Sequence, residues 1–380
     1  MPLESTKPMA DILIIPLPEL GHILPTLPLT RGLINQGHRV VYLTAPQFWQ
    51  EIASVGGVNE PLIYQDASSP KLSGSAVWYR FASGDASGKR VPQLQHVVKS
   101  LMDRGTFTLV LCDRILEVKY KSGLADLIGR QRVVLFSSSL FDWDDSNCGE
   151  VGGPTIVFCP ECFELPQFRI PRHQVFYVEP SLKPIDLESE GAEITRTSRP
   201  LIIAAFGTQS VRYGRLSACI EVIGKLARRR QDLQFVLAAG SSPSTGSLVQ
   251  CGALPNLTVQ EYLPQRRLLK FASAMITHGG LGSIKEAIFE GVPLIVIPML
   301  RDQPFNAMRI RHHGLGEAIF PDRLSLLGLE EALLHVLAGT YSSQISGMQS
   351  RFIALERSRL SHLLINSHLA SLESAAKSNS

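Results

Sequence analysis

Short, uninterrupted apolar runs recur along the chain, and each is followed by a turn and a segment with helical apolar spacing. The first run is Asp11–Leu17, the helical segment covers residues 24–33, and a second run follows at Val40–Leu43. A continuous apolar run is typical of a strand that is buried on both faces of a parallel sheet. Strand, turn, helix and strand within about 35 residues therefore predict a βαβ unit and a doubly wound α/β fold.

The same pattern returns further along the chain. Polar residues 181–199 lack periodicity and are expected to form a linker. We therefore predict two Rossmann-like doubly wound domains, residues 1–190 and 191–380, that face each other across a cleft. The terminal segment, about 345–375, is expected to be helical and to pack back on the first domain. The other expected elements are strands at 109–112, 133–136, 201–206, 235–239, 274–277 and 294–297 and helices at 117–128 and 213–230.

Composition narrows the classes of protein that fit. Apolar residues make up 44% of the 380 positions and charged residues 19%, which excludes a disordered chain. The net charge of +3 is too small for a nucleic-acid binder. No signal pattern and no apolar run of about 18 residues are present, so we expect a cytoplasmic protein without stable membrane insertion. We expect it to be a monomer or a homodimer.

The cysteines indicate neither a disulfide scaffold nor a metal site. Six cysteines are spread over 380 residues, whereas disulfide scaffolds are short and rich in cysteine. Cys159 and Cys162 have the spacing of half a zinc site, but no second pair follows. We therefore expect reduced thiols and no bound metal.

Most of the candidate ligand-binding residues lie within residues 262–307. There an apolar run leads into His278-Gly279-Gly280-Leu281-Gly282-Ser283, where a helix is expected to start. Glycines at such a junction let backbone N–H groups approach a ligand, and the helix N-terminus favours a diphosphate. The lysine of a P-loop and the GxGxxG spacing are both missing. A tight strand-to-helix turn without a ligand remains the structural alternative.

Two further residues stand where strands are expected to end. His22 lies in Gly21-His22-Ile23-Leu24-Pro25, directly after the first strand, and Asp113 ends the strand at 109–112. A histidine at a helix start is often only a cap or a packing residue, and an aspartate there is often a cap. Their positions at the carboxyl ends of strands in one sheet would also suit a base and the carboxylate that orients it.

Taken together, these motifs resemble family 1 glycosyltransferases, which are inverting nucleotide-sugar enzymes with the GT-B fold. The likeness is strongest over residues 10–45, 105–140 and 200–320, and it is closest to the bacterial macrolide and natural-product branch. The resemblance implies a metal-independent, inverting hexosyltransferase with no prosthetic group. Its donor would be a UDP- or dTDP-sugar, with UDP-glucose favoured, and its acceptor a small lipophilic molecule with a hydroxyl group.

The resemblance also assigns donor-binding roles. Tyr262 would stack on the nucleobase, backbone groups of Leu263 would meet the base edge, and Gln265 would complete that element. Glu286 would accept the ribose hydroxyls. Asp302 and Gln303 together would bind the hydroxyls of the sugar. The candidates for contact with the diphosphate are Gly207, Thr208, His278, Gly279, Gly280, Gly282 and Ser283.

For the acceptor half, the resemblance makes His22 the general base and Asp113 the residue that orients its ring. Aromatic residues that could line the acceptor pocket are Trp78, Phe81, Phe141 and Trp143. The chain is short for the family in the acceptor region, so the acceptor cannot be named by analogy.

Two other readings stay open. One is another enzyme of the same fold, either a sugar-nucleotide epimerase or a transferase that acts on a lipid-linked intermediate. The other is a non-catalytic auxiliary protein, which would tend to lose His22 or the Asp302–Gln303 pair.

Overall fold

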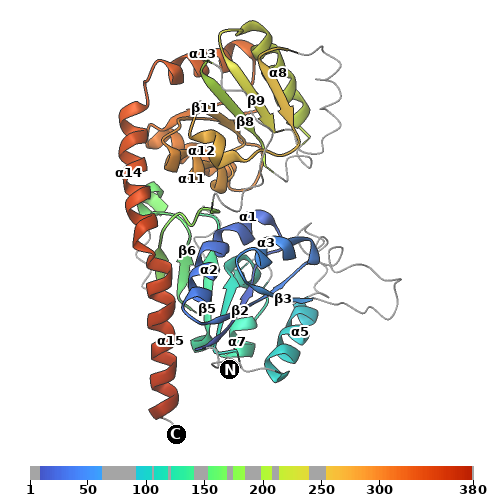
Figure 1. Ribbon diagram of the computed structural model, residues 1–380, viewed down its shortest axis with the longest axis vertical. Coiled ribbons are helices and arrows are strands. Elements are labelled where there is room, and N and C mark those ends of the chain that lie inside the picture. Colours follow the sequence, from blue (N-terminus) through green and yellow to red (C-terminus); the bar gives the residue numbers. More distant parts are fainter. Residues whose placement is uncertain are drawn as a thin grey trace, which may run out of the picture. The chain divides into compact units, whose positions relative to one another are not determined.

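A computed structural model describes the protein (Figure 1). The described residues are 9–61, 91–104, 107–118, 121–140, 153–168, 174–184, 198–207, 214–238 and 254–378. They form two compact units. Unit 1 consists of residues 1–159, 170–183 and 355–380, and unit 2 consists of residues 160–169 and 184–354. The expected domain boundary near residue 190 falls outside the described residues.

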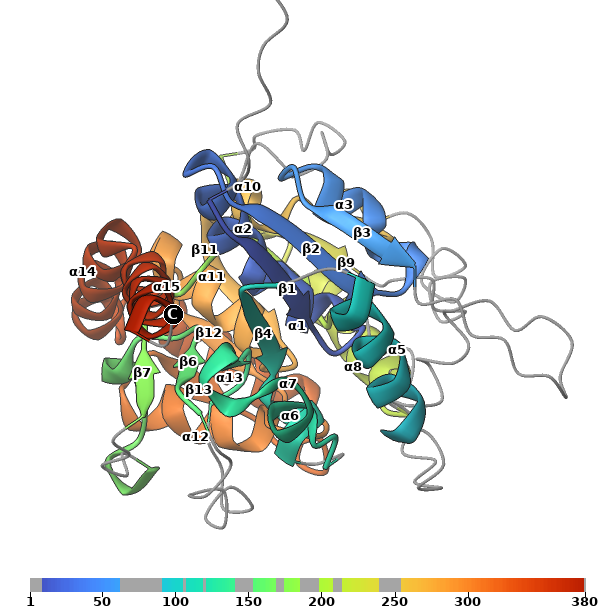
Figure 2. The same ribbon diagram turned by 90° about the horizontal axis from the view of Figure 1, so that it is seen from below.

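Unit 1 is built on a parallel sheet with strand order β3-β2-β1-β4-β5-β6-β7 (Figure 2). Its strands are β1 (Asp11–Ile15), β2 (Arg39–Thr44), β3 (Val58–Pro61), β4 (Leu109–Asp113), β5 (Val133–Ser137), β6 (Thr155–Val157) and β7 (Val175–Tyr177). Its α-helices are α1 (Leu20–Ile23), α2 (Leu27–Asn35), α3 (Trp49–Ala53), α5 (Val91–Arg104), α6 (Arg114–Val118), α7 (Leu124–Ile128) and α15 (Leu360–Ser378). The central strands are buried along their whole length because helices cover both faces of the sheet.

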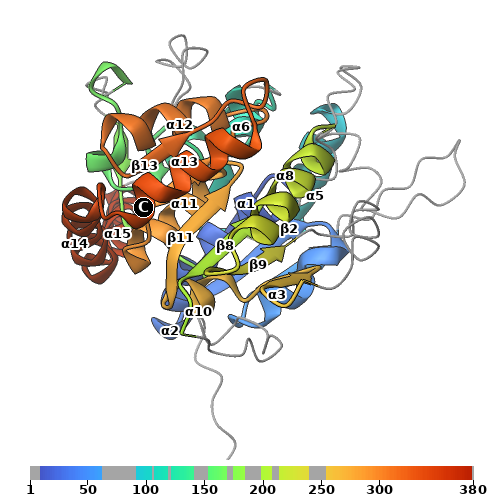
Figure 3. The same cartoon turned by 90° about the horizontal axis from the view of Figure 1, so that it is seen from above.

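Unit 2 has a second parallel sheet, with order β10-β9-β8-β11-β12-β13 (Figure 3). Its strands are β8 (Leu201–Ala205), β9 (Gln234–Ala238), β10 (Leu257–Gln260), β11 (Ala272–Thr277), β12 (Leu294–Val296) and β13 (Gly316–Ala318). Its helices are α8 (Leu216–Arg229), α10 (Gln265–Leu269), α11 (Leu281–Glu290), α12 (Gln303–His312) and α13 (Leu326–Leu337), and α14 (Ser342–Ser358) begins in it. Two short 3₁₀ turns, Glu161–Phe163 and Pro166–Phe168, also belong to this unit.

The core of unit 2 follows from helical and strand periodicity. Leu216, Ile220 and Ile223 form one buried stripe on α8, and they pack in a cluster with Ile202 and Phe235 of the sheet. Such a stripe is the face that an amphipathic helix buries against a sheet. The two parallel sheets confirm the α/β class, and the expected strands are all present within one or two residues.

The expected helix at 117–128 is wrong as a single element, because the chain forms α6 and α7 instead. The cause is the buried carboxylate of Glu117. Its Oε1 accepts hydrogen bonds from Ser122 Oγ (2.6 Å), Leu124 N (2.8 Å) and Ala125 N (3.3 Å). These bonds satisfy the first N–H groups of α7 and therefore favour a new helix start there.

The C-terminal segment consists of two helices rather than one. Between α14 and α15, Arg359 adopts φ +48°, which a continuous α-helix does not allow. Glu179 then caps α15 by accepting hydrogen bonds from Ser361 N (3.0 Å) and from its hydroxyl. Helix α15 contacts α2 within unit 1. Within the described residues, no helix has both the length and the apolar character needed to cross a membrane.

Candidate functional site

Both groups of candidate residues lie at the switch points of their sheets. In unit 1, β1 and β4 are neighbours, and the chain proceeds from them toward opposite edges of the sheet. In unit 2, β8 and β11 have the same relation. Ligands of open α/β sheets bind at the carboxyl ends of the strands beside such a point. His22 follows β1, Asp113 ends β4, Gly207 follows β8 and His278 follows β11.

The unit 1 site is a histidine–aspartate pair. His22 lies on the short helix α1, and its Nδ1 is 2.7 Å from Asp113 Oδ2. Asp113 is completely buried, and it also accepts hydrogen bonds from Leu17 N (3.2 Å) and Ile115 N (3.0 Å). Three donors therefore hold this carboxylate in one orientation.

The contact with Asp113 assigns the tautomer of His22. An ionised carboxylate can only accept a hydrogen bond, so Nδ1 must carry the proton. In the neutral ring the lone pair then lies on Nε2, which can accept a proton from another molecule. The pair has the geometry of a base with its orienting carboxylate.

Sequence analysis missed a third residue of this site. Ser138 Oγ lies 2.9 Å from the same Nδ1 of His22. Ser138 comes directly after β5, whose neighbour in the sheet is β4. Like Asp113, Ser138 is a polar residue at the carboxyl end of a central strand, and this shared position is the sequence signal that marks it.

The unit 2 site is centred on the buried ring of His278. A Cβ atom on Gly207 would lie 2.8 Å from His278 Cε1, and one on Gly280 would lie 2.6 Å from His278 Nε2. Both positions therefore require glycine for the ring to occupy its place. Burial lowers the pKa of His278 to about 4, with a smaller opposing effect from a backbone contact with Ala205. At neutral pH the ring is uncharged and offers hydrogen bonds rather than a positive charge.

Helix α11 begins directly after this ring. Gly280 is the N-cap residue, and among the described residues no side chain caps this helix end. Gly282 and Ser283 lie in its first turn, which carries unpaired N–H donors and the positive end of the helix dipole. An anion at this position would be stabilised by both.

A second group of candidates surrounds the start of α10. Tyr262 is 53% exposed, which is unusual for a large aromatic residue and leaves its ring surface accessible for stacking. The side chain of Leu263 is buried, so only its backbone could meet a ligand. Gln265 Nε2 donates to Glu286 Oε2 (2.5 Å) and lies 3.3 Å from Ser283 Oγ. The structure thus brings Gln265, Ser283 and Glu286 together.

The third group lies where α12 begins. Asp302 Oδ2 accepts a hydrogen bond from Asn306 Nδ2 (2.9 Å). Gln303 is buried, and its Oε1 accepts from Met299 N (2.8 Å) and Leu300 N (2.9 Å). A sugar contact by the Gln303 side chain would therefore have to be donated from Nε2.

Several predicted site residues lie outside the described residues. These are Thr208 of the donor group and the four aromatic residues expected at the acceptor pocket, Trp78, Phe81, Phe141 and Trp143. In the described part of the chain, no cluster of three histidine, cysteine, aspartate or glutamate side chains is arranged to hold a metal ion.

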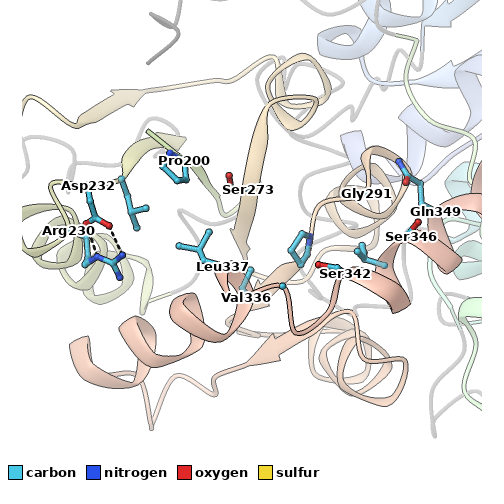
Figure 4. A pocket seen from close by; sticks show the side chains of 14 residues that line it. Pro200, Arg230, Asp232, Ser273, Gly291, Val336, Leu337, Ser342, Ser346 and Gln349 are labelled. Carbon is cyan, nitrogen blue, oxygen red and sulfur yellow. Dashed lines mark hydrogen bonds and ion pairs between the residues drawn. The ribbon is translucent and has the colours of Figure 1, made fainter. Parts of the chain in front are cut away.

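A pocket of about 490 Å³ in unit 2 lies away from these groups (Figure 4). Pro200, Ser273 and Pro293 line it, and they precede or begin β8, β11 and β12. The pocket is therefore at the amino edge of the sheet, opposite the edge with His278. Its charged lining residues, Arg230 and Asp232, are paired with each other at 2.7 Å. This pocket does not contain the candidate chemistry.

Comparison with known proteins gives a family match and a relative that spans most of the chain. The family described as UDP-glucoronosyl and UDP-glucosyl transferase matches residues 249–351. That range contains the donor candidates from Tyr262 to Gln303. NDP-glycosyltransferase YjiC of Bacillus subtilis (strain 168) is 26% identical over 361 residues, covering 85% of this chain and 88% of the relative.

Solved structures match the fold over nearly the whole chain. The glycotransferase of kitacinnamycin superposes with a TM-score of 0.74 at 19% identity, covering 96% of this chain and 100% of that one. Glycosyltransferase VinC, solved in complex with dTDP, gives a TM-score of 0.68 at 17% identity, covering 96% and 99%. At these identities the likeness shows the fold, which is GT-B.

Proposed function

We propose that this glycosyltransferase of GT-B fold belongs to family 1 and catalyses an inverting hexosyl transfer. The enzyme transfers a sugar from a nucleotide sugar. Our proposal specifies UDP-glucose as the favoured donor and a hydroxyl of a small lipophilic molecule as the acceptor. It also places the enzyme in the cytoplasm and assigns it no macromolecular partner other than a second copy of itself.

The observation that carries the proposal is the hydrogen bond of 2.7 Å between His22 Nδ1 and Asp113 Oδ2. It joins residues 91 positions apart at the switch point of the first sheet. A histidine that only caps a helix would not need a buried carboxylate behind its ring. The pair therefore supports a role in proton transfer over the purely structural alternative.

In the acceptor step, His22 Nε2 takes the proton of the acceptor hydroxyl as its oxygen attacks the anomeric carbon. The imidazolium that forms is stabilised by Asp113, which already holds Nδ1–H. The bond from the anomeric carbon to the diphosphate oxygen breaks in the same step. One displacement inverts the centre, so an α-linked donor gives a β-glycoside.

In the donor step, the leaving diphosphate gains negative charge that unit 2 must stabilise. The N–H groups at the start of α11 and the neutral His278 ring are the candidates for this role. Such fixed donors need little reorganisation as charge develops, which makes them effective. Because His278 is neutral, its contribution is a hydrogen bond and not an ion pair.

Nucleoside and sugar recognition would use the two remaining groups. Tyr262 offers an exposed ring for the base, and Glu286 offers a carboxylate to the ribose hydroxyls. Asp302 would accept hydrogen bonds from the sugar. UDP-glucose is favoured because of the Asp302–Gln303 pair, and a dTDP-sugar is the alternative because VinC was solved with dTDP.

A donor screen tests the proposal directly. The purified chain of 380 residues is mixed with UDP- or dTDP-sugars and a panel of phenolic and aliphatic alcohols, and release of the nucleoside diphosphate is measured. We expect acceptor-dependent release with a UDP-sugar, and a β-linked product by NMR from an α-linked donor. An α-linked product would refute the single displacement. Release without any glycoside, or no release from any donor, would refute the transfer.

A further inference from the structure

A fully buried ion pair lies in unit 2 behind the candidate sugar-binding residues. Glu164, next to the turn Glu161–Phe163, and Arg309, on α12, both have completely buried side chains. Glu164 Oε1 accepts from Arg309 Nε (2.8 Å) and Nη2 (2.6 Å), and also from Leu165 N (3.0 Å). Removing both charges from water is costly, so such a pair is weak evidence for a role in stability alone.

Arg309 extends this network to Asn306. Its Nη1 donates to Asn306 Oδ1 at 3.2 Å. A guanidinium can only donate, so the amide oxygen of Asn306 must face Arg309 and the amide nitrogen must face away. The Nδ2 atom donates to the backbone oxygen of Gly279 (2.9 Å) and to Asp302 Oδ2 (2.9 Å).

Asn306 is therefore held in one orientation. Its side chain is completely buried, its oxygen is bound to Arg309, and one N–H is anchored on the Gly279 carbonyl. The second N–H then points at Asp302 and fixes the carboxylate by its Oδ2 atom. Rotating the amide would place its nitrogen against the Arg309 guanidinium and lose all three bonds.

We propose that Glu164, Arg309 and Asn306 are positioning residues that orient the Asp302 carboxylate for the sugar of the donor. The inference rests on the proposed function, in which Asp302 accepts hydrogen bonds from sugar hydroxyls. It assigns a role to Glu164, which lies in the first half of the sequence and is separated along the chain from every donor motif.

The segment that carries Glu164 is attached to α12 by other contacts as well. Phe168 lies under the Arg309 guanidinium (5.6 Å to the ring centroid) and packs edge-on against Phe305. His313 Nε2 lies 3.1 Å from the backbone carbonyl oxygen of Phe163, and the Phe163 ring stacks on the His313 ring. The contacts of Phe168 with Phe305 and of Phe163 with His313 do not involve Glu164, Arg309 or Asn306, so variants of these three residues keep them and are expected to fold.

The central variant is Arg309→Lys. A lysine keeps a positive charge for Glu164, but one ammonium group cannot reproduce two bonds to Glu164 and a third to Asn306. The second variant is Asn306→Asp, which still accepts from Arg309 but cannot donate to Asp302. Arg311→Lys is the matched control, because Arg311 lies on the same helix and is exposed.

Release of nucleoside diphosphate from UDP-glucose gives the donor KM and kcat of each variant, and a thermal melt checks that it is folded. We expect Arg309→Lys and Asn306→Asp each to raise the donor KM about tenfold, and Arg311→Lys to leave it unchanged. In an Asp302→Ala background, Arg309→Lys should raise KM by less than about threefold, because the residue it positions is gone.

Two results would overturn the inference while leaving the proposed function in place. One is a wild-type donor KM in folded Arg309→Lys and Asn306→Asp. The other is the same tenfold effect of Arg309→Lys with and without Asp302, which would indicate a general structural role. If the wild-type chain neither binds nor turns over any nucleotide sugar, the proposed function fails, and this inference fails with it.

Discussion

Replacement of Gly207 by alanine tests the arrangement around His278. Gly207 has φ +73°, a left-handed conformation that residues with a Cβ adopt at a cost. The added Cβ would also lie 2.8 Å from His278 Cε1 and 3.0 Å from its Nε2. The ring is buried and also lies close to Gly280, so it has little room to move away.

The expected loss of stability follows from these two effects. The left-handed conformation costs a residue with a Cβ about 1–2 kcal/mol. Forcing one extra carbon into a packed site costs about 1–3 kcal/mol. Gly207→Ala should therefore lower the free energy of unfolding by about 2–5 kcal/mol. For a unit of this size that corresponds to a fall in Tm of roughly 4–20 °C.

Thermal unfolding with and without UDP measures both consequences of the substitution. Besides the lower Tm, we expect weaker stabilisation by UDP, because the substitution displaces the ring that we propose binds the diphosphate. Gly347→Ala is the control, since a Cβ there meets nothing within 4 Å on the exposed face of α14. It should gain up to about 1 kcal/mol from helix propensity. A Gly207→Ala protein that melts and binds UDP like the wild type would refute the reasoning.

Three further substitutions or conditions have defined outcomes. Asp113→Asn should lower kcat by about 10²–10⁴-fold, the span of general base catalysis, with unchanged UDP affinity in calorimetry; an equal loss of UDP binding would contradict this. Tyr262→Ala should weaken UDP binding by about 1–3 kcal/mol, the usual value of base stacking, whereas Tyr262→Phe should retain it. Lowering the pH from 6.5 to 4 should reduce the free energy of unfolding by about 3 kcal/mol through His278 alone. The reason is that the His278 ring takes up a proton near pH 6.5 in the unfolded state but only near pH 4 in the folded state. Urea unfolding of the wild type and His278→Asn at both pH values checks this, and equal losses in the two proteins would exclude His278 as the cause.

The fold could be predicted because its central strands are long and buried on both faces. The runs Ile12–Ile15 in β1, Leu109–Cys112 in β4 and Leu201–Ala205 in β8 are apolar throughout, which helices and loops rarely are. The three-residue strands β6, β7 and β13 were not expected from the sequence, whereas β12, which is equally short, was expected from its apolar run. The break between α6 and α7 depends on hydrogen bonds to one buried carboxylate, Glu117, and periodicity contains no information about that.

The candidate sites, like the fold, could be predicted only where they follow from the order of strands and from motifs. The sequence placed His22 and Asp113 at the carboxyl ends of parallel strands, which share one edge of a sheet, and the family resemblance implied their pairing. The Glu164–Arg309 pair could not be predicted, because its members are 145 positions apart and Glu164 belongs to no motif or regular strand. Burial of a charged pair results from how separate elements pack, and a single sequence does not reveal it.

The proposal that His22 is the general base is tested most directly by His22→Ala in two parallel measurements. One is the rate of UDP release from UDP-glucose with an alcohol acceptor, and the other is the affinity for UDP by calorimetry. We predict that transfer is lost while UDP affinity remains within about twofold of the wild type, because His22 belongs to unit 1 and the nucleotide candidates to unit 2. Turnover of an alcohol acceptor at the wild-type rate by His22→Ala would contradict the mechanism.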